Sequence, residues 1–137
     1  MKKLLVIAFL AALVGTTYAQ QAPAKQAFAA FTWESSSHDF GKIKQGTPVT
    51  HEFKFTNTGK TPLIITNVQA SCGCTTPSWT KEEVMPGGSG FIKATYNAAA
   101  VGAFNKTVTV TANIESGFVQ LTIKGEVLAA GASQPQK

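Results

Sequence analysis

The two cysteines of this 137-residue chain are Cys72 and Cys74, with Gly73 between them. Two thiols at this spacing allow three kinds of chemistry. They can oxidise to a disulfide if Gly73 makes a tight turn, and the small strained ring would make that bond labile and oxidising. They can stay reduced and bind a soft metal together, for which Cu(I) is the best match. They can also pack as small hydrophobic side chains. The residues alone leave these alternatives open.

The two histidines, His38 and His51, do not extend the cysteine pair into a zinc site. Such a site needs a second Cys pair or histidines at a characteristic spacing, and neither is present. His51 shares the alternation of Phe53, so we expect it to face inward near the end of a strand. His38 precedes Asp39 directly, and neighbouring strand residues point to opposite faces, so we expect no acid–base pair there.

Motifs for other catalytic chemistry are missing from the sequence. The segment Gly87-Gly88-Ser89-Gly90-Phe91 has Phe where a serine-nucleophile elbow needs its last glycine. There is no dinucleotide fingerprint or phosphate loop, and the acidic residues form no calcium-binding pattern. The sequence therefore predicts no catalytic residue, no enzyme activity apart from thiol redox chemistry, and no cofactor, with copper at the cysteine pair as the alternative.

Composition predicts a single folded domain. Apolar residues make up 44% of the chain and charged residues 14%, so the chain is too apolar to be disordered. Its 137 residues are too few for two ordinary domains. All 12 basic residues are lysines, against 7 acidic residues. The absence of arginine argues against a nucleic-acid partner, because the guanidinium fork is the favoured tool for phosphates.

Residues 1–19 have the pattern of a secretory signal peptide. Two lysines precede the apolar run Leu4–Val14, and Thr17 and Ala19 provide the small side chains that predict cleavage after Ala19. The apolar run is well short of the roughly 20 residues that cross a bilayer. We therefore expect an exported protein, periplasmic or secreted, with no membrane span after cleavage. Export favours oxidation of the two cysteines.

The rest of the chain alternates apolar and polar residues, as strands with one wet face do. We expect a flexible leader over 20–30, one domain over 31–128 and a disordered tail over 129–137. The predicted inward-facing residues are Val49, Phe53 and Phe55; Ile92, Ala94 and Tyr96; Phe104, Val108, Val110 and Ala112; and Val119, Leu121, Ile123 and Val127.

Regular turn signals separate these segments and complete the fold prediction. Short strands at this spacing favour an all-β fold, an antiparallel β-sandwich of about seven strands in two sheets. We expect a first strand within Phe31–Phe40. The segment Leu63–Ile65 is apolar at every position, which predicts a central strand or a strand with a bulge.

Several segments of the chain, taken together, have the pattern of one known family. The resemblance covers about Phe31–Leu128, and its most specific part is Ser71-Cys72-Gly73-Cys74-Thr75. The segments that carry the resemblance are Phe53–Ile65, Ala70–Thr75 with Pro77 and Trp79, Pro86–Gly88, Tyr96, Gly102, Phe104–Lys106 and Gly125–Val127. In these segments the chain resembles the bacterial domain-of-unknown-function 1573 family. The resemblance implies an immunoglobulin-like fold and export, in Bacteroidetes-type bacteria. It implies no activity or ligand, and it marks the two cysteines as the motif centre without a role.

Two functional hypotheses from different classes follow. The first is a non-catalytic binding or interaction module of the cell envelope, whose partner is an unknown protein or envelope component. Its candidate contact surface is the loop Cys72–Met85, which carries Pro77 and Trp79, although a tryptophan at this place more often packs in the core or at a sheet edge. The alternative is a periplasmic thiol-redox or copper-binding protein that uses Cys72 and Cys74. The sequence leaves the oligomeric state open.

Overall fold

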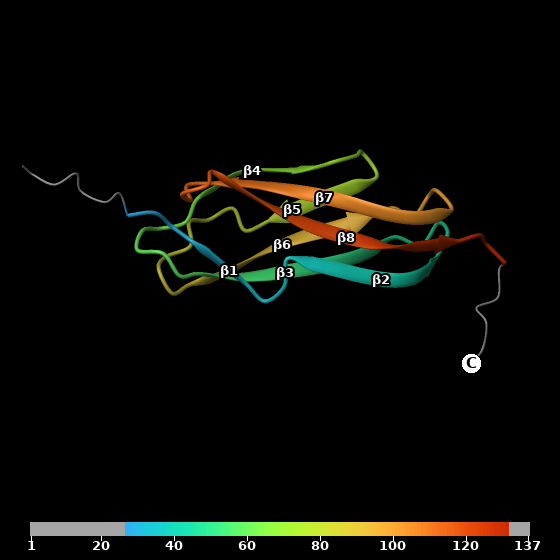
Figure 1. The fold of residues 1–137 in the computed structure, drawn as a ribbon, viewed down its shortest axis with the longest axis horizontal. Coiled ribbons are helices and arrows are strands. Elements are labelled where there is room, and N and C mark those ends of the chain that lie inside the picture. The colour runs from blue at the N-terminus through green and yellow to red at the C-terminus, as the bar shows by residue number, and fades with distance from the viewer. Residues whose placement is uncertain (1–26, 132–137) are drawn as a thin grey trace, which may run out of the picture.

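A computed structural model describes residues 27–131 of the chain. The predicted signal peptide, its cleavage site at Ala19, and the predicted leader and tail beyond these limits lie outside the described residues. Two four-stranded sheets pack face to face, with strand orders β1-β3-β6-β5 and β2-β8-β7-β4 (Figure 1). The described residues contain no helix. The prediction of an all-β, immunoglobulin-like sandwich is confirmed.

The sandwich has eight strands, where the sequence predicted about seven. They are β1 (Phe31–Trp33), β2 (Ser37–Lys44), β3 (Val49–Asn57), β4 (Ile65–Ala70), β5 (Thr75–Trp79), β6 (Ser89–Tyr96), β7 (Gly102–Ala112) and β8 (Phe118–Leu128). Two strands were not predicted separately. The single strand predicted within Phe31–Phe40 is two strands, and β5 lies within the segment that was predicted to be a loop. The chain leaves β1 in one sheet, crosses at residues 34–36, and enters β2 in the other.

The prediction of an entirely antiparallel sandwich is wrong at β2. This strand runs parallel to β8, with Ser37 opposite Thr122, and its register shifts between Asp39 and Lys42. A crossing connection from the other sheet brings β2 in alongside β8, and such a connection allows parallel pairing where a hairpin would not. A Cβ on Gly125 would lie 2.8 Å from the carbonyl oxygen of Gly41, so this glycine lets the irregular part of β2 lie against β8.

The structure shows different surroundings for the three apolar residues of the segment Leu63–Ile65. Leu63 is fully buried and pairs with Val84 in an isolated bridge, whereas Ile64 is 45% exposed. The strand β4 begins at Ile65 and is an edge strand, so the central-strand interpretation is wrong. A register shift between Ile65 and Asn67 shows that the bulge interpretation is right.

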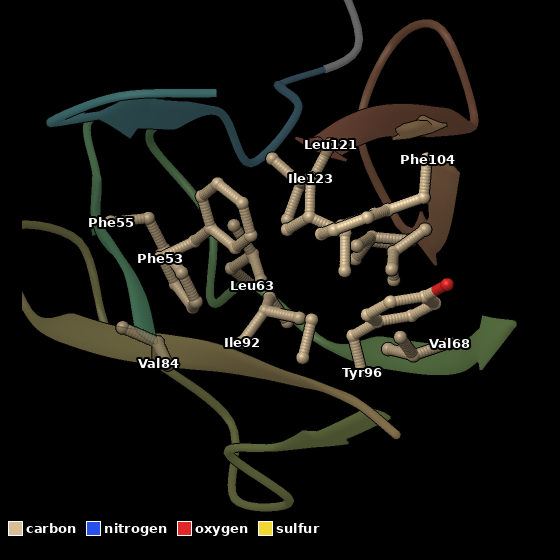
Figure 2. Packing of buried hydrophobic residues seen from close by; sticks show 14 of the residues in the cluster. Phe53, Phe55, Leu63, Val68, Val84, Ile92, Tyr96, Phe104, Leu121 and Ile123 are labelled. Carbon is tan, nitrogen blue, oxygen red and sulfur yellow. The ribbon is translucent and has the colours of Figure 1, made fainter. Parts of the chain in front are cut away.

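Side chains from both sheets meet in one apolar core (Figure 2). The predicted alternation is confirmed at most positions, and Val49 and Val119 are half-buried. Each Phe, Ile or Leu buried in this way stabilises the fold by about 1.5–3 kcal/mol. The buried apolar residues are Ala29, Phe53, Phe55, Leu63, Val68, Val84, Ile92, Ala94, Tyr96, Ala98, Phe104, Val108, Val110, Ala112, Leu121, Ile123 and Val127.

The side chain of Asn57 is fully buried and hydrogen-bonded at both ends. Its Nδ2 donates to the carbonyl oxygens of Thr61 at 2.8 Å and Val84 at 2.9 Å. Its Oδ1 accepts from the backbone N–H of Gly59 at 3.0 Å and of Ala30 at 3.3 Å. One amide thereby joins the N-terminal segment, the turn after β3 and the loop before β6.

The sandwich begins before Phe31, although the sequence predicted a flexible leader as far as residue 30. Ala29 is buried in the core with 2% exposure. Thr58 and Lys60 donate backbone hydrogen bonds to the carbonyl oxygens of Ala30 and Phe28, which continues the β1–β3 pairing toward the N-terminus. Residues 28–30 are therefore a part of the sandwich.

We expect Asn57→Asp to destabilise the protein in a pH-dependent way. The carboxylate would face the two carbonyl oxygens that now accept from Nδ2, and this loss should cost about 3 kcal/mol of unfolding free energy near pH 7. Burial and the facing carbonyls should raise the pKa of the new carboxyl above its unfolded value of about 3.9. Stability should therefore fall as the pH rises through about 4, because the unfolded state then binds fewer protons than the folded state. Urea unfolding near pH 4 and pH 7 measures this.

The variant Asn57→Ala is the control for this experiment. It loses the same hydrogen bonds but carries no titratable group, so its deficit relative to the unmodified protein should be similar at both pH values. A deficit of Asn57→Asp that does not shrink at the lower pH would contradict the role assigned to the Nδ2 donor.

Candidate functional site

A disulfide joins Cys72 and Cys74, whose Cα atoms lie 5.3 Å apart. The pair occupies the turn between β4 and β5, where the chain passes from one sheet to the other. Both cysteines are half-buried, and Cys74 packs against the core, while Gly73 is exposed. In this oxidised state the pair offers no thiolate to a metal.

Backbone hydrogen bonds fix the disulfide turn to both sheets. Ser71 and Thr107 are joined twice, from Ser71 N to Thr107 O at 2.8 Å and from Thr107 N to Ser71 Oγ at 3.1 Å. On the other side, Asn97 N donates to Cys74 O at 3.0 Å. The hydroxyl of Thr75 lies 3.9 Å from each sulfur. The turn is therefore a rigid end of the sandwich.

Pro77 and Trp79 lie on the edge strand β5, so the predicted interaction loop is a strand over part of its length. Both side chains are half-buried on the face that turns toward the interior. Trp79 packs against the core, and Lys81 Nζ lies 3.0 Å from the centroid of its ring. The indole is thus occupied by contacts within the chain, which is the sheet-edge packing that the sequence left open.

The outer edge of β5 is poorly suited to pair with another strand. Thr80 N donates to Phe91 O, so the alternate backbone groups at Thr75, Pro77 and Trp79 point away from β6. Proline has no N–H, and Pro77 therefore removes the central donor of this edge. A proline in this position blunts an edge without breaking its own sheet.

The rings of His38 and His51 stack face to face, with centroids 3.7 Å apart and planes at 7°. His38 comes from β2 and His51 from β3, so the stack bridges the two sheets. Phe40 contacts His38 edge-on at 4.6 Å, and Phe53 contacts His51 in the same way. His51 is half-buried. The stack could not be predicted from the sequence, which does not show that β2 and β3 belong to different sheets.

Burial lowers the pKa of His51 below its ordinary value of 6.5, and the neighbouring His38 lowers it further, while Glu52 acts in the opposite direction. A neutral His51 suits the stack, because two imidazolium rings at this distance would repel each other. We therefore expect this contact between the sheets to weaken in acid.

An apolar groove of about 1000 Å³ lies between β1 and the start of β8. Phe31 and Trp33 stack on one wall with ring centroids 4.7 Å apart, and Val119 lies on the other. This groove could not be predicted from the sequence, because it forms only where β1 and β8 belong to different sheets. Its main apolar lining residues are Phe28, Ala29, Phe31, Trp33, Ile114 and Val119.

Metal-binding side chains do not gather in the part of the chain that the structure describes. Between residues 27 and 131, no group of three or more His, Cys, Asp or Glu could hold a metal ion. Over the same residues, no helix has the length and apolar character needed to cross a membrane.

Two face-to-face sheets with these strand orders define an immunoglobulin-like β-sandwich domain. The profile of a family described as a protein of unknown function, DUF1573, matches residues 31–127, and the chain belongs to this family. The resemblance found in the sequence is thereby confirmed. No curated protein sequence is significantly similar to this chain.

Solved structures share the fold at low sequence identity. A protein of unknown function from Porphyromonas gingivalis W83 is 19% identical with a TM-score of 0.66, over 77% of this chain and 51% of that one, so this chain spans about half of its length. The ASH/PapD-like domain 7 of human CEP192 is 10% identical with a TM-score of 0.63, over 80% and 93%. The secreted serine protease VesC from Vibrio cholerae is 16% identical with a TM-score of 0.56, over 78% and 24%. Identities this low show the fold alone.

We expect the His38–His51 stack to make stability fall in acid. The unfolded chain protonates His51 at its ordinary pKa of about 6.5, whereas the folded chain resists protonation, so the unfolding free energy should drop as the pH falls below about 6.5. His51→Phe keeps a flat ring in the stack and cannot titrate. Urea unfolding between about pH 7.5 and pH 5 should give a shallower fall for this variant. Equal slopes for the two proteins would contradict the proposed effect.

Proposed function

We propose that this chain is a non-catalytic binding module of the cell envelope, which contacts a protein or another envelope component through the groove beside β1. The observation that carries this proposal is the groove itself. Aromatic and aliphatic side chains form most of the lining of an open concave surface of about 1000 Å³ at the edge of the sandwich. An accessible apolar surface of this kind is typical of an interaction site.

Export is the second part of the proposal. The predicted signal peptide with cleavage after Ala19 and the family resemblance support it. A disulfide between Cys72 and Cys74 is compatible with an oxidising compartment such as the periplasm or the cell exterior.

The contact surface proposed here differs from the one that the sequence suggested. Trp79 is engaged by the core and by Lys81, and Pro77 blunts its own edge. By contrast, Phe28 is 40% exposed at the groove, and Phe31, Trp33 and Val119 are half-buried there. A role for Pro77 and Trp79 in binding a partner stays a prediction.

We expect Val119→Asp to remove partner binding without removing the fold. A carboxylate in the groove would oppose burial of an apolar partner, so retention of the partner from solubilised envelope extract should fall at least about tenfold. Gln120→Asp is the matched control, because it adds the same charge one residue away on the exposed face of β8. Quantitative mass spectrometry of retained proteins measures the effect, and thermal unfolding confirms that both variants fold. Equal retention by the two variants would count against the groove.

A thiol-redox role is the second candidate function, and the disulfide at Cys72–Cys74 favours it. In such a role a substrate thiolate attacks one sulfur and forms a mixed disulfide, and a second substrate thiolate then releases the reduced pair while the substrate becomes oxidised. The reduced pair could also hold Cu(I) through two thiolates. Both activities require that the turn opens readily to a reductant.

We expect the disulfide to be structural, with a small contribution to stability. Closing so short a loop should contribute about 1–2 kcal/mol, so the double variant Cys72→Ser, Cys74→Ser should unfold slightly earlier and retain partners as before. The small ring alone would make the disulfide labile, but both cysteines are half-buried in a turn that is hydrogen-bonded to both sheets. Alkylation of the native protein followed by mass spectrometry should therefore give no labelling until a strong reductant is added. Rapid labelling in glutathione, with protection by Cu(I), would favour the redox candidate instead.

A further inference from the structure

We infer that the groove accepts an extended strand of a partner protein, which pairs with the open edge of β8 at Phe118–Leu121. This inference rests on the proposed binding function, and it adds how the partner is held and what kind of segment it is. The evidence is the unequal length of two paired strands, the direction of the backbone groups of β8, and the apolar wall opposite.

The strand β8 extends beyond its neighbour β2. The first residue of β2 is Ser37, which lies opposite Thr122, whereas β8 begins at Phe118. Over Phe118–Leu121, β8 is therefore paired on its β7 side, and no described strand lies on its other side. The open stretch of β8 is continuous with the β2–β8 ladder.

The register of β7 and β8 fixes the direction of the free backbone groups. Ala112 N donates to Gly117 O, so Val119 and the alternate residues after it bond to β7. The backbone N–H and C=O groups of Phe118, Gln120 and Thr122 point away from β7, toward the side of β2. The hydrogen bond from Thr122 N to Ser36 O at 2.9 Å shows this direction. Gln120 therefore presents its N–H and C=O to the side on which β2 is missing.

The side chains around the open edge match an added strand. Val119 points into the groove, while Phe118 and Gln120 are exposed on the outer face of the sheet. The stacked rings of Phe31 and Trp33 form the opposite wall, in the other sheet. A strand placed beside β8 would direct every second side chain between the sheets and the others to solvent. Its main chain would provide affinity, and its inward side chains would provide specificity.

The other two possible occupants fit the groove less well. Residues 20–26, which precede the described chain, read Gln-Gln-Ala-Pro-Ala-Lys-Gln, and their only apolar side chains are two alanines and one proline, which are small for a groove of about 1000 Å³. Two copies paired through the same open edges would bring one Val119 toward each groove and leave most of it unfilled. The occupant is therefore an extended segment of another protein, with large apolar side chains at alternate positions.

The test uses residues 20–137 and a synthetic heptapeptide that alternates Thr with Val or Phe, capped at both ends. We expect the amide hydrogens of Phe118 and Gln120 to exchange quickly in the free protein, and at least about tenfold more slowly with saturating peptide. The same peptide with N-methyl groups at alternate positions cannot pair with β8 and should not bind. Amide exchange and binding are followed by nuclear magnetic resonance.

Two variants at Gln120 separate main-chain pairing from side-chain contact. Gln120→Pro removes the outward N–H without removing a hydrogen bond to β7, and it should weaken peptide binding at least about tenfold. Gln120→Ala keeps the N–H and should bind as the unmodified protein does. The N-methylated peptide tests the same hydrogen bonds in the unmodified chain, so the inference stays testable if the proline variant fails to fold.

Each other outcome overturns the inference in a distinct way. Binding that is lost in Val119→Asp, but that tolerates both Gln120→Pro and N-methylation, would leave a binding groove without strand pairing. If neither peptide binds, the inference of an added strand is wrong. The proposed function would still be supported if Val119→Asp loses partners that the unmodified protein retains from envelope extract. If the amides of Phe118 and Gln120 exchange slowly without peptide, and more slowly at higher protein concentration, a second copy of the chain occupies the edge. Slow exchange that disappears when residues 20–26 are removed would assign it to the leader.

Discussion

The buried amide of Asn57 is the constraint on which the shape of the groove beside β1 depends. A buried polar group without partners costs about 1–3 kcal/mol, so its four hydrogen bonds must form together. These bonds place Ala30 next to the turn after β3. The position of Ala30 in turn sets the direction in which the chain enters β1. Phe31 and Trp33 then have fixed positions as one wall of the groove. The same amide holds Val84, whose bridge to Leu63 closes the core beneath.

The second determinant is the crossing from β1 to β2. Because the chain changes sheets at residues 34–36, the strand that follows pairs with β8 only from Thr122 onward. On one side of this crossing, β2 approaches β3 closely enough for His38 to stack on His51. On the other side, the start of β8 stays open above β1. One connection thus produces both the pH-sensitive contact between the sheets and the groove.

The sequence predicted the parts of the fold that depend on local alternation. Phe53, Ile92 and Leu121 face the core because every second residue of a strand does. The division of Phe31–Phe40 between two sheets was beyond this reasoning, since alternation is the same on either side of a crossing. The parallel pairing of β2 follows from that crossing, so it was missed for the same reason.

The candidate sites could likewise be predicted only as far as local sequence determines them. The chemistry open to Cys72 and Cys74 could be stated from their spacing, but their oxidation state depends on the turn geometry that both sheets impose. The alternation of His51 placed its ring inward, yet which side chain it would meet depended on the position of β2. The groove combines residues far apart in the chain, including Phe31 and Val119, and no local pattern links them.

The other edges of the sandwich give a reason to regard the open stretch of β8 as functional. Unpaired edges invite unwanted association, and proteins commonly blunt them with short strands, bulges, prolines or charges. Here β1 has three residues, β5 carries Pro77, β4 has a bulge after Ile65, and β2 has an irregularity between the charged residues Asp39 and Lys42. The stretch Phe118–Leu121 contains no proline, charge or register shift. An edge left unprotected beside an apolar groove, in a domain that protects its other edges, is best explained by a strand that must reach it.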